Sequence, residues 1–209
     1  MNVLCRYIRV IILLFWAGAV SAQDKSLLER LYSDMTSSCV SMEYTYSTRF
    51  SGIKAEGGGV IEIQGDMWVM KGNGVEMWCD GATLWAADPS LKEVVIEPAS
   101  SEDESAMMTN PAVLFTGMND LFDLSSSLPS DDGKAMIFFL VPKKPGNVSF
   151  CNVEVMNEDA SIRSGVFAFA DGNKVEVKVG SMTLGPRKAQ ENFRPQIRFD
   201  STWIVTDMR

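Results

Sequence analysis

The side chains that could do chemistry here are carboxylates, because the 209-residue sequence contains no histidine. A serine–histidine triad, a histidine-ligated zinc ion and an imidazole base are therefore excluded. Aspartates stand at or next to expected turns: Asp66, Asp80, Asp88, Asp132 and Asp171. Aspartate is favoured in turns because its side chain accepts hydrogen bonds from the nearby backbone. We expect these residues to shape turns and predict no catalytic residue, although a carboxylate pair of the glycoside-cleaving kind stays open.

Cysteines and glycines offer little more chemistry. Cys39, Cys79 and Cys151 are 40 and 72 residues apart, and these separations match no compact metal motif. The fourth cysteine, Cys5, lies in the N-terminal export signal described below, so the mature chain holds three and at least one thiol is unpaired; we favour buried free thiols, with one disulfide as the alternative. The three glycines at 57–59 lack the lysine and the following helix of a phosphate loop, so we expect a flexible turn there. The sequence thus predicts no metal and no cofactor.

The N-terminal residues have the pattern of an export signal. Two arginines precede an apolar run at 10–16, and small residues follow up to Ala22. The apolar run is too short to cross a bilayer as a helix. Gln23, rather than a cysteine, stands at the expected cleavage point, which predicts no lipid tail. We therefore expect a signal peptide at 1–22 and a single mature domain at 23–209.

The mature chain is expected to be strongly acidic. The sequence holds 19 Lys and Arg against 27 Asp and Glu, a net charge of −8, which becomes −10 without the two arginines of the signal. Such a charge argues against nucleic acid as a partner and against attraction to anionic lipid surfaces. It also keeps copies of a protein apart, so we expect a monomer.

The elements that would position these side chains are one helix and a long series of strands. Ser26 and Glu29 form a capping box, and apolar residues recur at helical spacing, which predicts a helix over residues 25–37. Short β-rich runs separated by glycine turns then predict a hairpin meander. The predicted strands are 41–50, 59–65, 67–71, 75–79, 83–88, 92–98, 135–142, 149–156, 164–171 and 174–180, with one or two more over 196–207.

Two regions interrupt the strands. Residues 100–105 read as a solvated acidic loop, and residues 110–118 as a short helix with Asn110 as its cap and Pro111 at its first position. The stretch from there to about Lys134 is expected to be a loop. The fold class is therefore mainly β (α+β), with antiparallel strands linked in sequence into one curving sheet.

Apolar residues occupy both faces of several strands. In the runs MWVM at 67–70 and MIFFLV at 136–141, every residue is apolar, so no polar residue alternates with the apolar ones. Both sides of the sheet must then meet something apolar, and two short helices are too small to cover all of it. The sheet either curls around a packed core or encloses a cavity for an apolar ligand, and twelve mature methionines favour an adaptable lining.

The stretch at 59–98, with the turn CDGATLWAADP at its centre, resembles the periplasmic outer-membrane lipoprotein carrier family, LolA. The proline-started run NPAVLFTG and the ending IRFDSTWIVTDMR are similar to later parts of that family. The resemblance implies an unclosed antiparallel β-barrel, here of about 10–11 strands, with short helices forming a lid. It implies a periplasmic carrier that accepts lipoproteins from an inner-membrane exporter, shields their acyl chains and passes them to an outer-membrane receptor.

The resemblance also suggests which residues would meet the acyl chains. By alternation along the strands we expect Met67 and Val69 to line the cavity, together with Val75 and Met77. The helices would add Leu27, Leu31 and Leu114, while Trp68, Trp78 and Trp85 would pack on the outer side. The family ties its barrel to the lid through an arginine; Lys71 takes that position here, and lysine lacks the guanidinium fork.

Two other classes of function stay open. One is a different lipid-binding or lipoprotein-sensing module on the same scaffold, although a sensor would need a further domain for its regulatory partner. The other is a secreted hydrolase that uses carboxylates, which would lose activity when paired acids are neutralised.

Overall fold

The computed structural model describes residues 22–50, 53–99, 121–144 and 146–209. One long helix, α2 (Ala22–Ser37), precedes twelve strands of a single sheet, and a 3₁₀ turn, η1 (Gln190–Phe193), lies before the last strand. The strands are β1 (Cys39–Phe50), β2 (Ile53–Gln64), β3 (Met67–Gly72), β4 (Val75–Asp80), β5 (Thr83–Asp88), β6 (Glu93–Pro98), β7 (Phe122–Pro129), β8 (Ala135–Pro142), β9 (Val148–Met156), β10 (Ile162–Phe169), β11 (Lys174–Gly185) and β12 (Ile204–Asp207).

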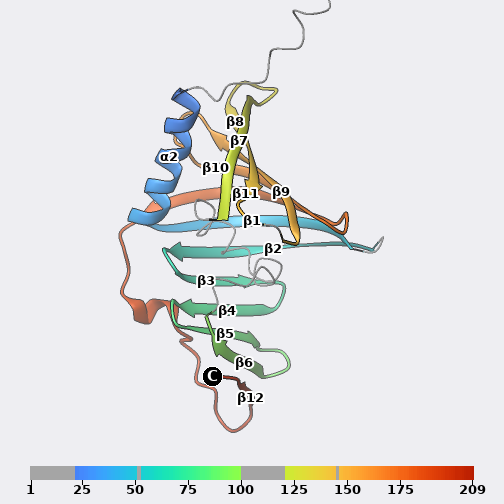
Figure 1. The fold of residues 1–209 in the computed structure, drawn as a ribbon. Coiled ribbons are helices and arrows are strands. Elements are labelled where there is room, and N and C mark those ends of the chain that lie inside the picture. The colour runs from blue at the N-terminus through green and yellow to red at the C-terminus, as the bar shows by residue number, and fades with distance from the viewer. Residues whose placement is uncertain (1–21, 51–52, 100–120, 145) are drawn as a thin grey trace, which may run out of the picture.

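The sheet consists of two meanders joined by one long-range strand pair. Its order is β12-β6-β5-β4-β3-β2-β1-β11-β10-β9-β8-β7, so β11 returns to pair with β1. Every pair is antiparallel except β12 with β6. The two outermost strands, β12 and β7, do not meet, and Figure 1 shows the strands from β10 to β7 turned steeply against those from β1 to β6. The predicted unclosed, mainly antiparallel sheet is therefore confirmed.

Short turns hold the first meander in register. Between β3 and β4 only Asn73 and Gly74 intervene, with positive φ angles of 53° and 80°, as a two-residue hairpin turn of this type requires. This turn pairs Gly72 with Val75 and, further along, Met70 with Met77.

Gly59 and Gly72 mark a place where two strands come very close. A Cβ on Gly59 would collide with the carbonyl oxygen of Lys71, and one on Gly72 would collide with that of Gly58. The glycines at 57–59 lie inside β2, paired with residues of β1, and not in the flexible turn that we expected. They are needed because the strands leave no room for side chains there.

The inner face of the sheet is the one that α2 covers, and it carries the main core. Residues that alternate along β1, β2 and β11 belong to or pack against this inner core: Met42, Tyr44, Tyr46, Ile61, Ile63, Val175, Val177 and Val179. Figure 1 shows α2 alongside the sheet, reaching from the start of β1 towards β8 and β7.

The outer face of β3 to β6 carries a second apolar cluster. This outer cluster consists of Trp78, Ala87, Val94 and Ile96, with Val69, Trp85, Phe199 and Trp203 packed against it. The last two of these residues come from the C-terminal segment, residues 186–203. In Figure 1 this segment passes the ends of the first-meander strands on its way to β12. The C-terminal segment thus covers the outer face of strands that are apolar on both faces.

One expectation needs correction, one is confirmed, and two fall outside the described residues. The expected loop up to Lys134 contains β7, which pairs with β8 and forms one edge of the sheet. The end of the chain forms one short strand, β12, which runs parallel to β6. The acidic loop at 100–105 and the short helix at 110–118 lie outside the described residues.

Candidate functional site

The candidate site is the apolar inner face beneath α2. Leu28, Leu31 and Met35 recur at helical spacing and are buried against the inner core, with exposures of 4%, 1% and 5%. Leu27 and Tyr32 pack against the same core at its margin. The helix therefore lies on the sheet by a single apolar stripe, as the sequence predicts.

Polar contacts hold α2 at three places. Ser127 Oγ of β7 lies 2.8 Å from Asp24 Oδ2, near the start of the helix. Arg30 Nη1 donates to the Glu158 carbonyl oxygen at 3.2 Å, in the turn between β9 and β10.

The third contact holds the helix end. Arg187 Nη1, just beyond β11, donates to the Thr36 carbonyl oxygen at 2.7 Å. The three contacts reach three separate parts of the sheet and its extension. None of the three is part of a strand ladder.

The phenol group of α2 and the thiol groups of the sheet are unreactive. Burial raises the pKa of Tyr32 to about 12, and the neighbouring Cys151 adds to this shift. Burial likewise raises the pKa of the Cys39, Cys79 and Cys151 thiols. All three cysteines are free and buried, so the expectation of buried free thiols is confirmed. Neutral thiols of this kind are poor nucleophiles, and they act here as small apolar side chains.

The aspartates serve turns, as predicted. Asp80 Oδ1 accepts hydrogen bonds from the backbone N–H groups of Ala82 and Thr83, each at 3.0 Å. Asp88, Asp132 and Asp171 accept backbone N–H groups two residues further on. Within the described part of the chain, no group of three or more acidic or cysteine side chains is arranged to hold a metal ion.

Several predicted cavity residues lie on the inner face. Leu31 is a member of the inner core and Leu27 packs against it. Val75 and Met77 of β4 also belong to this side, and Met77 is 8% exposed. Leu114 lies outside the described residues. The structure thus brings Leu27, Leu31, Val75 and Met77 to one apolar surface; their contact with a ligand stays a prediction.

The expected face of β3 is wrong. Val69 is paired with Trp78 and packs in the outer cluster, so it lies on the opposite face from Met77. Met67 alternates with Val69 and shares that outer side. The inner face of β3 instead carries Trp68, which is buried in the inner core, and Met70.

The sequence contains a signal that Val69 and Met77 lie on opposite faces of the sheet. A two-residue turn at Asn73 and Gly74 pairs Met70 directly with Met77, so these two side chains must share a face. The expected outer position is confirmed for Trp78 and Trp85 and is wrong for Trp68.

Lys71 makes a contact different from the expected one. Its ammonium lies 2.7 Å from Glu76 Oε2 on the neighbouring strand and 5.9 Å from the ring centroid of Trp78. Trp78 belongs to the outer cluster, so Lys71 lies on the side of the sheet away from α2. The lid contact proposed for this residue is therefore not made to α2.

In the described residues, no helix combines the length and the apolar character needed to cross a membrane. Fold and site together define a mainly β protein with an unclosed sheet, one amphipathic covering helix and an apolar inner face.

Comparison with known proteins supports this description at the level of fold. No protein-family model matches the sequence, and neither does any curated protein. An uncharacterized conserved protein from Thermus thermophilus is 11% identical with a TM-score of 0.55, over 88% of this chain and 98% of that one.

Two further solved structures are similar to this chain. The LolA superfamily protein NE2245 from Nitrosomonas europaea is 12% identical with a TM-score of 0.47, over 85% of this chain and 99% of that one. A putative outer membrane lipoprotein-sorting protein domain from Vibrio parahaemolyticus is 11% identical with a TM-score of 0.43, over 82% and 97%. At these identities the likeness is one of fold alone.

Proposed function

We propose that this protein is a periplasmic carrier that shields lipoprotein acyl chains on the inner face of its sheet. It would accept them from an inner-membrane exporter and deliver them to an outer-membrane receptor, acting by binding and not by catalysis. The export pattern at 1–22 and the family resemblance support the compartment and the cargo. The observation that carries the proposal is the covering helix: a removable apolar stripe on the inner face of an unclosed sheet.

The burial energy of one acyl chain is similar in size to that of the buried side chains of α2. Burying Leu28, Leu31 and Met35 contributes about 5–9 kcal/mol, at about 1.5–3 kcal/mol for each side chain. A sixteen-carbon acyl chain buries about fourteen methylenes, worth about 11 kcal/mol at about 0.8 kcal/mol each. The chain can therefore replace the helix stripe on the inner face, and the polar contacts of α2 can re-form when the cargo leaves.

Adjacent residues of β3 provide the test, because Met70 lies on the inner face and Val69 on the outer face. Each would be changed to glutamate, and folding would be verified by circular dichroism. The assay measures how much tripalmitoylated lipopeptide each protein releases from vesicles into solution. We expect Met70→Glu to reduce release at least tenfold, because a charge on the inner face costs several kcal/mol to bury.

Val69→Glu is the matched control and should retain release in proportion to its folded fraction. Equal release by the wild type and by a folded Met70→Glu variant would rule out the inner face as the acyl site. Release by neither the wild type nor the Val69→Glu variant would rule out lipoprotein carriage itself.

A further inference from the structure

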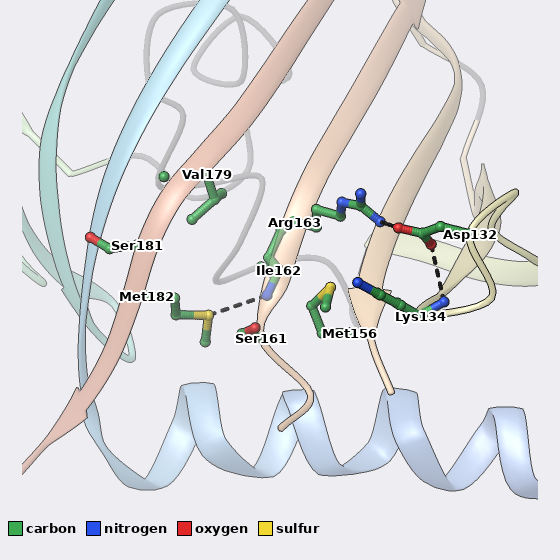
Figure 2. Close-up of a pocket in the computed structure, with 10 residues that line it drawn as sticks. Asp132, Lys134, Met156, Ser161, Ile162, Arg163, Val179, Ser181 and Met182 are labelled. Atoms are coloured by element: carbon green, nitrogen blue, oxygen red, sulfur yellow. Dashed lines mark hydrogen bonds and ion pairs between the residues drawn. The ribbon is translucent and has the colours of Figure 1, made fainter. Parts of the chain in front are cut away.

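Strands β10 and β11 separate from each other at the end nearest α2. Their ladder ends at the pair Ser164 and Lys178, whereas β11 continues along β1 as far as the pair Gly185 and Cys39. The last part of β11 therefore has a strand neighbour on one side and a gap on the other. Figure 2 shows this gap, with α2 running across its base.

A pocket of about 370 Å³ lies at this separation. It is lined by Asp132, Lys134, Met156, Ser161, Ile162, Arg163, Val179, Gly180, Ser181 and Met182. The deepest of these residues belong to the inner core: Ile162 is 3% exposed, and Val179 and Met182 pack against the core. The rim residues Lys134, Arg163 and Ser181 are exposed, so the pocket leads from solvent to apolar side chains.

Where the β10–β11 ladder has ended, a methionine side chain takes the place of a backbone hydrogen-bond acceptor. The backbone N–H of Ile162 donates to Met182 Sδ at 3.4 Å, where a continued ladder would offer a carbonyl oxygen. A thioether is a weak acceptor, and a methionine side chain changes rotamer at low cost. The side chain of Met182 therefore closes the pocket, and an apolar ligand group that fits the pocket better can displace it.

The rim of the pocket carries two cations, Lys134 and Arg163, and the carboxylate of Asp132. Arg163 is engaged by two carboxylates, Asp132 at 2.9 Å and Glu154 at 3.4 Å. Lys134 is different: Figure 2 shows its side chain extending towards Met156 and Ile162. Among the described residues, its ammonium forms no ion pair. Of the two cations in the lining, Lys134 is thus the one without an ion pair among the described residues, and it lies beside an apolar floor.

We propose that this pocket binds a single-chain fatty carboxylate. The carboxylate would pair with Lys134 at the rim, and the chain would displace Met182 and pack on Ile162 and Val179. A small inorganic anion would leave the apolar floor unfilled, and a neutral hydrocarbon would leave the ammonium unpaired. The site opens at the rim, whereas the face proposed for lipoprotein chains is covered by α2; its floor residues Ile162, Val179 and Met182 pack in the same inner core.

Methyl resonances of the methionines provide a direct readout. The full chain, labelled with ¹³C-methyl methionine, would be titrated with sodium dodecanoate below its micelle concentration. We expect the Met156 and Met182 resonances to shift together and to saturate. Met208, 55% exposed near the chain end, is the internal control and should not move.

Charge and space are tested by separate variants. Lys134→Gln should weaken dodecanoate binding about fivefold, as expected for a partly exposed ion pair, and should leave binding of the neutral dodecanol unchanged. Lys144→Gln, beyond the opposite end of β8, is the matched control and should bind dodecanoate like the wild type. Ser181→Trp should fill the pocket and abolish binding, whereas Thr183→Trp, two residues further along β11, should not.

The proposal is overturned if dodecanoate leaves Met156 and Met182 unmoved, or if Lys134→Gln and wild type bind it equally. The two assays distinguish failure of this site from failure of the proposed carrier function. Lipopeptide release with no dodecanoate shift would sustain the carrier and remove this site, and a dodecanoate shift with no lipopeptide release would do the reverse.

Discussion

Asp80 is the residue at which a turn, the sheet and the C-terminal segment meet. Its carboxylate accepts two backbone N–H groups of the following turn and the Nε–H of Arg194 at 2.7 Å. Its side chain is 4% exposed. Desolvation by burial raises the pKa of Asp80, but the hydrogen bonds from Thr83, Arg194 and Ala82 outweigh it, and the pKa lies below its ordinary value of 3.8. The folded state thus prefers the ionised carboxylate.

This preference makes the contribution of Asp80 depend on pH. A carboxyl group with a lowered pKa stabilises the fold above its unfolded pKa, and this stabilisation is lost as the pH falls through the folded value. Asp80→Asn should therefore lower the free energy of unfolding by about 2 kcal/mol at pH 7. In urea denaturation series, the gap between variant and wild type should narrow once the pH falls below about 4. A gap that stays constant down to pH 2 would contradict the assigned role of the charge.

At the scale of elements, α2 is held by contacts that can be weakened without touching its apolar stripe. Arg30 and Arg187 each donate to a main-chain carbonyl oxygen. Replacing both with glutamine should cost about 1 kcal/mol each. Hydrogen exchange of the Leu28 and Leu31 amides should then accelerate about thirtyfold, while exchange in β1 stays unchanged. Arg198→Gln, an exposed change in the C-terminal segment, is the control and should leave the helix protected.

Elements were predictable from sequence where local pattern decides them. The spacing of leucines in α2 and the strict alternation in β1, β2 and β11 identify both the elements and their buried faces. Strand β7 escapes detection because its sequence, FDLSSSLP, has little β propensity; its pairing with β8 holds it in place. Strand β12 lies within the strand region predicted at 196–207, but its parallel pairing with distant β6 could not be predicted from local pattern.

The site residues were predictable in part, and the error has a physical origin. Alternation gives which residues of β3 share a face, but it does not say which of the two faces is inside. Both faces of β3 are apolar because the C-terminal segment covers the outer one. The pairing of Met70 with Met77 across the two-residue turn shows that these residues share a face, so Val69 and Met77 cannot line the same cavity.

At the scale of the whole molecule, the C-terminal segment covers the outer face of the sheet, so that both faces carry buried apolar side chains. Gln64, 2% exposed, exchanges two hydrogen bonds with the backbone of Lys188, at 2.9 and 2.7 Å. Phe199 and Trp203 then cross the outer cluster, with ring centroids 5.0 Å apart. The sequence of this segment is polar and without periodicity, which is why its role as a cover does not emerge from pattern alone.

Phe193 tests whether this cover is part of the folded unit. It is fully buried in η1, against β3 and β4. Phe193→Ala should lower the free energy of unfolding by about 3 kcal/mol. Because Trp78 and Trp85 lie in the outer cluster, loosening of the segment should also shift tryptophan emission to longer wavelength before the sheet unfolds. Phe150→Ala, at a phenylalanine that is 38% exposed, is the matched control and should cost less than about 1 kcal/mol. Equal losses in the two variants would show that the segment lies on the sheet without stabilising it.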